Sequence, residues 1–139
     1  SDPYNADVSL TPDSSSATYK KKLMAGILEK MKAVTDNRSI PLVLLIIPHP
    51  MDVLNGVHDS GEVDRNAYPE YRPAALTDFL QHAAGEYKIA NVNLFDTFQQ
   101  HDAAKLYFSG GDDHWNELGQ AAAAEEVANY LMSQELLTE

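Results

Sequence analysis

The chain has 139 residues, 44% of them hydrophobic and 22% charged, a length and composition that fit one globular domain and exclude wholesale disorder. Its 21 acidic and 10 basic residues give a formal net charge of −11, which disfavours nucleic acid and anionic lipid as partners. The absence of cysteine excludes a disulfide framework and a thiolate nucleophile. The longest apolar run, residues 40–48, is about half of what a membrane-spanning helix needs, so no membrane segment is expected.

The first part of the chain predicts a lead-in followed by a helix. Residues 1–13 mix Pro, Asp, Asn and Ser without periodicity, so we expect them to be irregular, with residues 14–139 forming a single α/β domain. From residue 14 onward, apolar side chains recur at helical spacing, and Asp13 or a serine at 14–16 can cap the first turn. The stripe consists of Tyr19, Leu23, Ile27, Met31 and Val34. This pattern predicts an amphipathic helix that ends near Asp36.

The middle of the chain predicts a buried strand, a long loop and a second helix. Residues 40–48, with the sequence IPLVLLIIP, are continuously apolar, which is typical of a strand buried on both faces in a parallel sheet. Residues 49–69 predict a long loop of the kind that is usually functional or mobile. A helix is expected to start near Pro69 or Pro73 and to end around residues 85–88.

The last third predicts one more strand and a long final helix. Residues 89–95 alternate enough for a strand, residues 96–105 suit a short helix or turn, and residues 106–108 suit an extended stub. A glycine break at 109–111 then precedes a helix from about residue 116 to 137. Its apolar face is expected to comprise Leu118, Ala121, Ala124, Val127, Ala128 and Leu131.

This alternation of helices and strands predicts a three-layer α/β/α fold with a parallel sheet, similar to flavodoxin-like folds. Only two convincing strands are present, fewer than a sheet covered on both faces normally has. We therefore expect the chain to form the later half of a larger doubly wound domain. The missing strands would come from an upstream segment, from a partner such as a second copy of the chain, or from the lead-in.

The densest polar cluster, GGDDHWNELG over residues 110–119, lies where sites form in such folds, after an extended segment and before a helix. Asp112 with His114 is a suitable pair for general-base chemistry, because a carboxylate that accepts from Nδ1 fixes the tautomer of the imidazole. The alternative is structural: Asp112 or Asp113 caps the helix, and His114 is an ordinary surface residue.

Residues 106–131, LYFSGGDDHWNELGQAAAAEEVANYL, resemble the last conserved block of the SGNH (GDSL-type) hydrolases, and the order of the preceding elements is similar to the second half of that fold. The resemblance implies a Ser-His-Asp triad in which His114 is the general base and Asp112 its orienting carboxylate, with Asp113 in reserve. The common family spacing is Asp-x-x-His, whereas Asp112 lies two residues before His114. This shorter spacing resembles the branch that modifies exported polysaccharides, including alginate-acetylation proteins.

The Gly-Asp-Ser block that supplies the family's nucleophile has no counterpart here. The serines at 14–16 start a helix, Ser109 lies in the glycine break, and Ser60 suits a turn in the long loop. We therefore expect the nucleophilic serine to lie outside this chain, upstream, and the isolated chain to be inactive. The predicted function is hydrolysis or transfer of small acyl esters, including esters of carbohydrates. The alternative is a noncatalytic α/β module that binds a partner through the loop at 49–69 and an acidic surface.

The remaining candidates have weaker signals. His49 directly follows the predicted strand, so it can line a substrate pocket, although packing or surface placement is the commoner role. Trp115 can form a pocket wall or anchor the core. His114 with Asp112, or His101 with Asp102, are conceivable metal ligands, but no histidine spacing of a metal site occurs, so neither a metal nor a cofactor is expected.

Overall fold

Two parallel strands form the centre of the protein, which we describe from a computed structural model covering residues 3–59 and 61–134. Strand β1 (Val43–Ile46) pairs in parallel with β4 (Ala90–Asn93), with Val43 opposite Ala90 and Ile46 opposite Asn93. The parallel pairing predicted for residues 40–48 and 89–95 is confirmed, and both strands are shorter than the apolar runs that predicted them.

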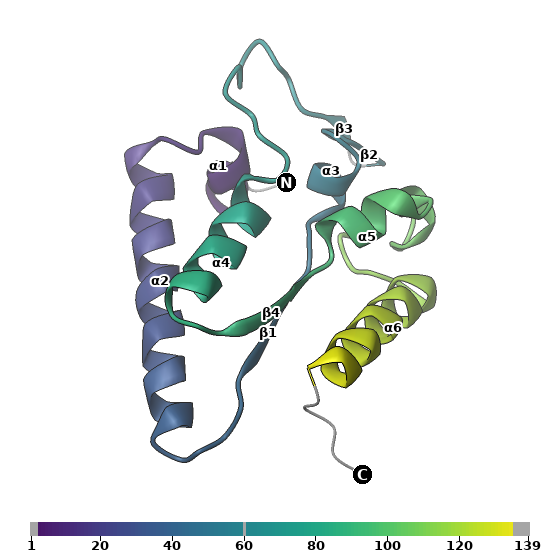
Figure 1. Cartoon of the computed structure of the whole chain (residues 1–139). Helices are drawn as coiled ribbons and strands as arrows, with labels where there is room; N and C mark the ends of the chain where they lie inside the picture. The colour runs from purple at the N-terminus through teal and green to yellow at the C-terminus, as the bar shows by residue number, and fades with distance from the viewer. Residues whose placement is uncertain (1–2, 60, 135–139) are drawn as a thin grey trace.

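Helices cover both faces of this strand pair (Figure 1). Helices α2 (Ser15–Asp36) and α4 (Ala75–Glu86) lie on one side, where Leu44 packs with Leu28 and Ala84. On the other side, α5 (Phe95–Gln100), the short 3-10 helix η1 (Ala103–Lys105) and α6 (Glu117–Ser133) enclose the larger cluster, against which Leu45 packs. The alternate residues Leu44 and Leu45 thus face opposite layers, as expected for a strand. This is the predicted three-layer α/β/α arrangement, reduced to two central strands.

The first helix corrects the expected irregular lead-in. Residues Pro3–Leu10 form α1, which packs against α2 and α4. Its Val8 is buried, and the backbone N–H of Arg72 donates to the carbonyl of Ser9 over 2.9 Å. An eight-residue helix is too short to be stable by itself, so these tertiary contacts and not local periodicity determine it. Over residues 3–10 the lead-in therefore supplies no missing strand.

The segment 49–69 is also more regular than the long loop that we expected. It contains the one-turn helix α3 (Pro50–Val53) and a small antiparallel hairpin of β2 (Val57–His58) and β3 (Gly61–Glu62). Elements of two to four residues leave no periodic signal in a sequence. Gly56, with φ of 95°, makes the turn between α3 and the hairpin.

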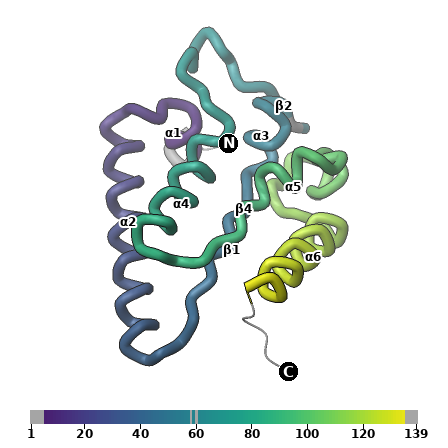
Figure 2. The backbone as a smooth tube through the Cα atoms, in the orientation of Figure 1, coloured from purple at the N-terminus to yellow at the C-terminus, as the bar shows by residue number. Residues whose placement is uncertain are grey.

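Exposure on the α2 side differs from the prediction as well. Of the four residues of β1 only Ile46 is buried, and within residues 3–59 and 61–134 no third strand pairs with the free edge of β1. The expected helix over 14–36 is confirmed, with Ser14 as the N-cap whose Oγ accepts from Ala17 N–H over 3.1 Å. Its apolar stripe is nevertheless exposed, and Figure 2 shows α2 at the outer edge of the fold. The exposed residues of this α2 stripe are Tyr19, Leu23, Ile27, Met31 and Val34.

The final helix has the predicted start but a different buried face. Asn116 caps α6, whose buried residues are Gly119 and Ala123, whereas Leu118 is 53% exposed. Helix α6 approaches the backbone of Leu106 so closely that a Cβ at position 119 would lie 2.5 Å from the Leu106 carbonyl oxygen. In this alanine-rich helix the hydrophobic pattern is weak, so the close approach at glycine decides the orientation.

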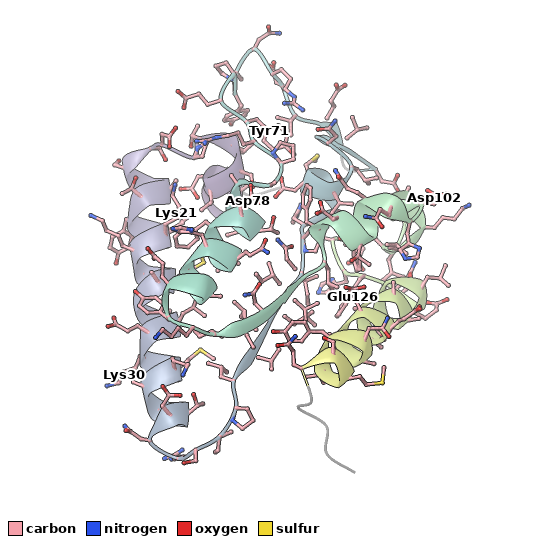
Figure 3. All side chains as sticks on the ribbon, viewed as in Figure 1. Lys21, Lys30, Tyr71, Asp78, Asp102 and Glu126 are labelled. Atoms are coloured by element: carbon pink, nitrogen blue, oxygen red, sulfur yellow. The ribbon has the colours of Figure 1, made fainter. Side chains whose placement is uncertain are left out.

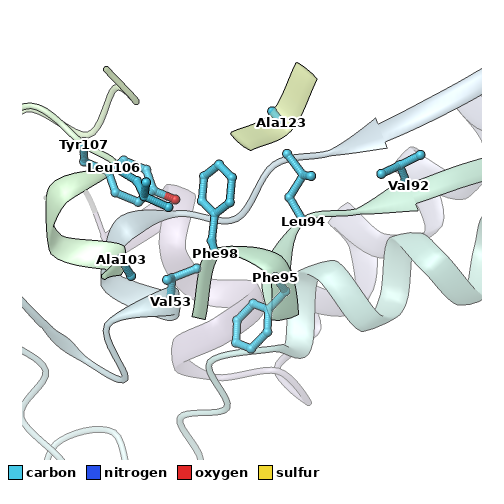
Figure 4. Packing of buried hydrophobic residues seen from close by; sticks show 9 residues of the cluster. All are labelled: Val53, Val92, Leu94, Phe95, Phe98, Ala103, Leu106, Tyr107 and Ala123. Carbon is cyan, nitrogen blue, oxygen red and sulfur yellow. The ribbon is translucent and has the colours of Figure 1, made fainter. Parts of the chain in front are cut away.

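Phe98 occupies the middle of the larger core (Figure 4). Its side chain is fully buried and meets the Tyr107 ring edge to face, with centroids 5.9 Å apart and planes at 75°. Trp115 packs against the Phe98 ring, with the ring centroids 6.4 Å apart. This cluster therefore lies directly beneath the segment that carries the polar cluster of the sequence. No helix in the part of the chain that the structure describes is long and apolar enough to cross a membrane.

Candidate active site

Residues 106–116 form a closed loop, named here the site loop. Its two ends are joined by backbone hydrogen bonds, from Phe108 N–H to His114 O over 3.0 Å and from Asn116 N–H to Leu106 O over 2.9 Å. Gly110 and Gly111 make the turn with φ of 84° and 79°, values that side chains rarely tolerate. The predicted glycine break is thus the tip of a turn that presents residues 112–114.

Asp112 and His114 form a hydrogen-bonded pair on this loop. Asp112 Oδ1 accepts from His114 Nδ1 over 2.6 Å and from the His114 backbone N–H over 2.9 Å. These bonds, the backbone one first, hold the pKa of Asp112 below its ordinary value. An ionised carboxylate can only accept, so Nδ1 carries a proton and the neutral imidazole has its lone pair on Nε2. The imidazole is 85% exposed, and no atom of the described residues bonds to Nε2.

Asp113 does not cap the helix, which Asn116 does; it pairs with a second histidine. His49 Nε2 lies 3.2 Å from Asp113 Oδ2. The other ring nitrogen of His49, Nδ1, accepts from the Met51 backbone N–H over 3.1 Å at the start of α3. Because a neutral imidazole that accepts at one nitrogen carries its proton on the other, the protonated nitrogen of His49 is Nε2, the one that lies beside the Asp113 carboxylate. The two adjacent carboxylates therefore each serve a different histidine.

Further contacts hold the site loop at the carboxyl end of β1. Tyr107 donates from its hydroxyl to Pro48 O over 2.8 Å, and burial raises the pKa of this phenol, which keeps it protonated. Asn116 Nδ2 bonds to the carbonyl oxygens of Lys105 and Tyr107, at 2.8 and 2.9 Å. Gly110 N–H donates to Asp59 Oδ2 over 3.0 Å, which joins the tip of the loop to the β2–β3 hairpin. The His–Asp pair thus rests on a well-anchored support.

A buried carboxyl group beneath this support was not predicted. Asp52 is 6% exposed; Ser9 Oγ donates to its Oδ2 over 2.8 Å, and the Tyr71 hydroxyl lies 3.0 Å from its Oδ1. The same hydroxyl lies 3.1 Å from Met51 O. Burial raises the pKa of Asp52 despite these hydrogen bonds. No sequence signal marks Asp52, because it lies in a four-residue helix and its partners are at least 19 positions away.

A pocket of about 230 Å³ opens between α1, α3 and Tyr71, whose position beside α1 is labelled in Figure 3. Most of its wall is apolar, and His49 and Asp113 contribute polar groups. The apolar residues that line it include Val8, Leu10, Met51, Val63 and Leu76. His49 therefore lines a pocket, while Trp115 packs on Phe98 and is not part of this wall.

The other sequence candidates lie elsewhere or are engaged. Ser60 lies outside the described residues, and no serine hydroxyl within residues 3–59 and 61–134 contacts His114. Asp102 pairs with Lys105 at 2.9 Å and not with His101. Over the same residues, no group of three histidine or carboxylate side chains is arranged to hold a metal ion.

A layered α/β/α arrangement, with a His–Asp pair between the end of a parallel strand and the final helix, is the layout of an SGNH-type domain. Comparison with family models matched the SGNH hydrolase-like domain of acetyltransferase AlgX over residues 4–139. The chain belongs to this family, which confirms the resemblance to SGNH hydrolases and to the alginate-acetylation branch. Neither the curated proteins nor the solved structures gave a significant match.

Proposed function

We propose that this domain contributes the base and the orienting carboxylate of a Ser-His-Asp triad that hydrolyses or transfers small acyl esters, including esters of carbohydrates. The family is one of acyl hydrolases and acetyltransferases. The observation that carries the proposal is the 2.6 Å bond between Asp112 and His114 Nδ1, with Nε2 facing solvent. The loop that carries this pair is anchored by four hydrogen bonds, from Tyr107, Gly110 and Asn116.

In this mechanism His114 Nε2 accepts the hydroxyl proton of the serine as its oxygen attacks the ester carbonyl carbon. Asp112 stabilises the imidazolium that forms, and its lowered pKa keeps it ionised for that role. Collapse of the tetrahedral intermediate breaks the bond to the alcohol, which leaves with the proton from Nε2. Water or an acceptor hydroxyl then attacks the acyl-serine, with His114 again taking and returning the proton.

The serine itself is proposed to come from outside these 139 residues, as are further strands of the sheet. The α2 stripe and the free edge of β1 are adjacent unsatisfied surfaces, and α2 packs on the same sheet face as α4. Crossover connections in parallel sheets are right-handed, so a strand joined to β1 through α2 belongs on the side of β1 away from β4. A strand from an upstream segment would take this position, and a strand from a second copy of the chain, which needs no such connection, would pair with the same free edge.

The test compares variants of the longest natural form of the protein, assayed with p-nitrophenyl acetate and with an acetylated carbohydrate. His114→Ala is expected to lower kcat/KM by about 10²–10⁴-fold, the range for loss of a general base. Asp112→Asn should cost at least about 100-fold, because the wrong tautomer is then stabilised. Asp113→Asn is the matched control, since it removes the neighbouring charge but leaves the His114 partner in place, and its loss should be smaller.

Full activity in the His114→Ala variant with an intact fold would contradict the proposal and favour a noncatalytic binding module. The position of the serine is tested separately, by intact mass of the 139-residue chain after a fluorophosphonate probe. We expect no adduct, since such probes react with activated serines. A single adduct would place the nucleophile inside the chain, and mapping would begin at Ser60.

A further inference from the structure

The pocket between α1, α3 and Tyr71 adjoins the proposed catalytic pair. Asp113 lies in its wall, and Asp112, the carboxylate that orients His114, is the preceding residue. Consecutive Cα atoms are about 3.8 Å apart, so the rim of the pocket adjoins the loop that carries the His–Asp pair. The pocket contacts no part of the larger core around Phe98, and neither the anchoring of the site loop nor the proposed triad explains why it is hollow.

The shape and chemistry of the pocket indicate what fits it. Its volume of about 230 Å³ is below the range of about 300–1,000 Å³ that is usual for ligand pockets, which favours a small group. Val8, Leu10, Val63 and Leu76 provide an apolar wall. The one buried carboxyl group in that wall, Asp52, already accepts hydrogen bonds from Ser9 and Tyr71, so it needs no hydrogen-bond donor from a ligand.

The charge at the mouth of the pocket selects further. Among the described residues that line it there is no lysine or arginine, whereas Asp113 is partly exposed beside it and Asp112 precedes Asp113 on the same loop. His49 Nε2, the nitrogen that carries the ring proton, lies 3.2 Å from Asp113 Oδ2. A ligand carboxylate would therefore meet like charge at Asp113, while the Arg65 guanidinium, which lies 4.5 Å from the centroid of the pocket-lining Tyr71 ring, already donates to Asn55 O over 3.0 Å.

We propose that this pocket receives the acyl part of the ester, and that it takes short, uncharged acyl groups while it excludes those that bear a carboxylate. The identification of the ligand as an acyl group rests on the proposed function, but binding of the ligand can be measured without turnover. His49 is a positioning residue in this proposal, because it holds Asp113 at the rim of the pocket while its own Nδ1 is fixed by Met51.

The experiment is an NMR titration of the 139-residue chain with two probes of similar size, methyl butyrate and the butyrate anion. Methyl butyrate is expected to shift the methyl signals of Leu10, Val63 and Leu76 in a saturable way at millimolar concentrations. Butyrate is expected to bind about tenfold more weakly, the effect of one unfavourable charge pair at close range in partly screened surroundings. Asp113→Asn should narrow that difference.

Leu76→Trp should abolish the binding of methyl butyrate by filling the pocket, whereas Leu118→Trp, the same change at an exposed position of α6, should not. If Leu76→Trp unfolds the chain, as circular dichroism would reveal, the smaller change Leu10→Phe replaces it. The absence of saturable shifts with methyl butyrate, or equal binding of ester and anion, would overturn the proposal.

Binding and catalysis can fail independently. His114→Ala should leave the methyl butyrate shifts unchanged, because His114 does not line the pocket. If methyl butyrate gives no saturable pocket shifts in the wild-type chain, while His114→Ala loses most of the activity, the acyl pocket is refuted and the triad proposal stands. The reverse result would refute the triad and keep the pocket as a binding site for small neutral groups.

Discussion

Helices α6 and α2 meet the rest of the protein in opposite ways. The alanine-rich α6 is packed so tightly at Gly119 that its backbone touches that of Leu106. The more strongly patterned α2 buries Ala17 and Leu28 but exposes its apolar stripe. How deeply each helix is buried therefore depends on its contacts with the site loop and not on how apolar its own sequence is. The α6 side is a packed core beneath the candidate site, whereas the α2 side leaves its apolar stripe exposed.

The largest difference between the two sides is expected from truncating one large apolar residue on each. Phe98→Ala should lower the free energy of unfolding by about 3–5 kcal/mol, because it empties the centre of the α6-side core. Ile27→Ala, in the exposed α2 stripe, should change it by no more than about 0.5 kcal/mol. Urea unfolding at several protein concentrations measures both. Similar losses in the two variants would mean that the α2 stripe is covered in solution.

Adding one methyl group to a glycine on each side sharpens the contrast. Gly119→Ala places a Cβ 2.5 Å from Leu106 O and 3.0 Å from Trp115 Cβ, so it should destabilise by about 1–3 kcal/mol. Gly26→Ala, in the interior of α2 with nothing within 4 Å, should stabilise by about 0.5–1 kcal/mol. Thermal unfolding followed by circular dichroism distinguishes opposite shifts in Tm. Two shifts of the same sign would contradict the packing at Gly119.

The buried Asp52 should make the stability of the site's support depend on pH. Burial raises its pKa above the ordinary 3.8, so the folded state binds the proton more tightly than the unfolded chain. Its contribution to the free energy of unfolding is therefore full below pH 3.8 and falls as pH rises through the raised pKa. Asp52→Asn, which can still bond to Ser9 and Tyr71, should flatten this dependence. Urea midpoints across that pH range test it.

Asp52→Ala is the matched comparison, because it removes the acceptor of the Ser9 hydroxyl and leaves the Tyr71 hydroxyl with Met51 O alone. It should cost about 1–3 kcal/mol, the usual penalty for buried polar groups that lose a partner. An alanine variant as stable as the wild type would show that the network contributes no net stability.

A small effect on stability, and the clearest one on assembly, is expected from the α2 stripe. Leu23→Gln combined with Met31→Gln should leave the free energy of unfolding within about 1 kcal/mol, since both side chains are half exposed. The same pair should reduce association of the chain with the strands or second copy that we propose to cover this face. Analytical ultracentrifugation of the chain measures its self-association. A wild-type chain that stays monomeric, with the edge of β1 covered by its own residues, would refute the proposed covering.

The site was predictable to different degrees. Asp112 and His114 are recognisable because both lie in one short polar stretch before a helix, and local sequence determines their pairing. The partnership of Asp113 with His49 joins residues 64 positions apart, so no local pattern shows it. Asp52 depends on a short helix and on contacts with α1, which was itself expected to be irregular. Residues brought together by tertiary contacts leave no periodic trace.

By itself, the sequence determined the alternation of helices and strands, the parallel pairing of two apolar segments, and the place of the His–Asp pair before the last helix. These depend on hydrophobic periodicity, on capping residues such as Ser14, and on glycines that permit a positive φ. Only the tertiary structure decided that α1 is a helix, that α6 turns Gly119 inward, and that the α2 stripe is exposed. Those outcomes depend on which surfaces meet, and a chain with only two central strands leaves part of its apolar surface without a neighbour.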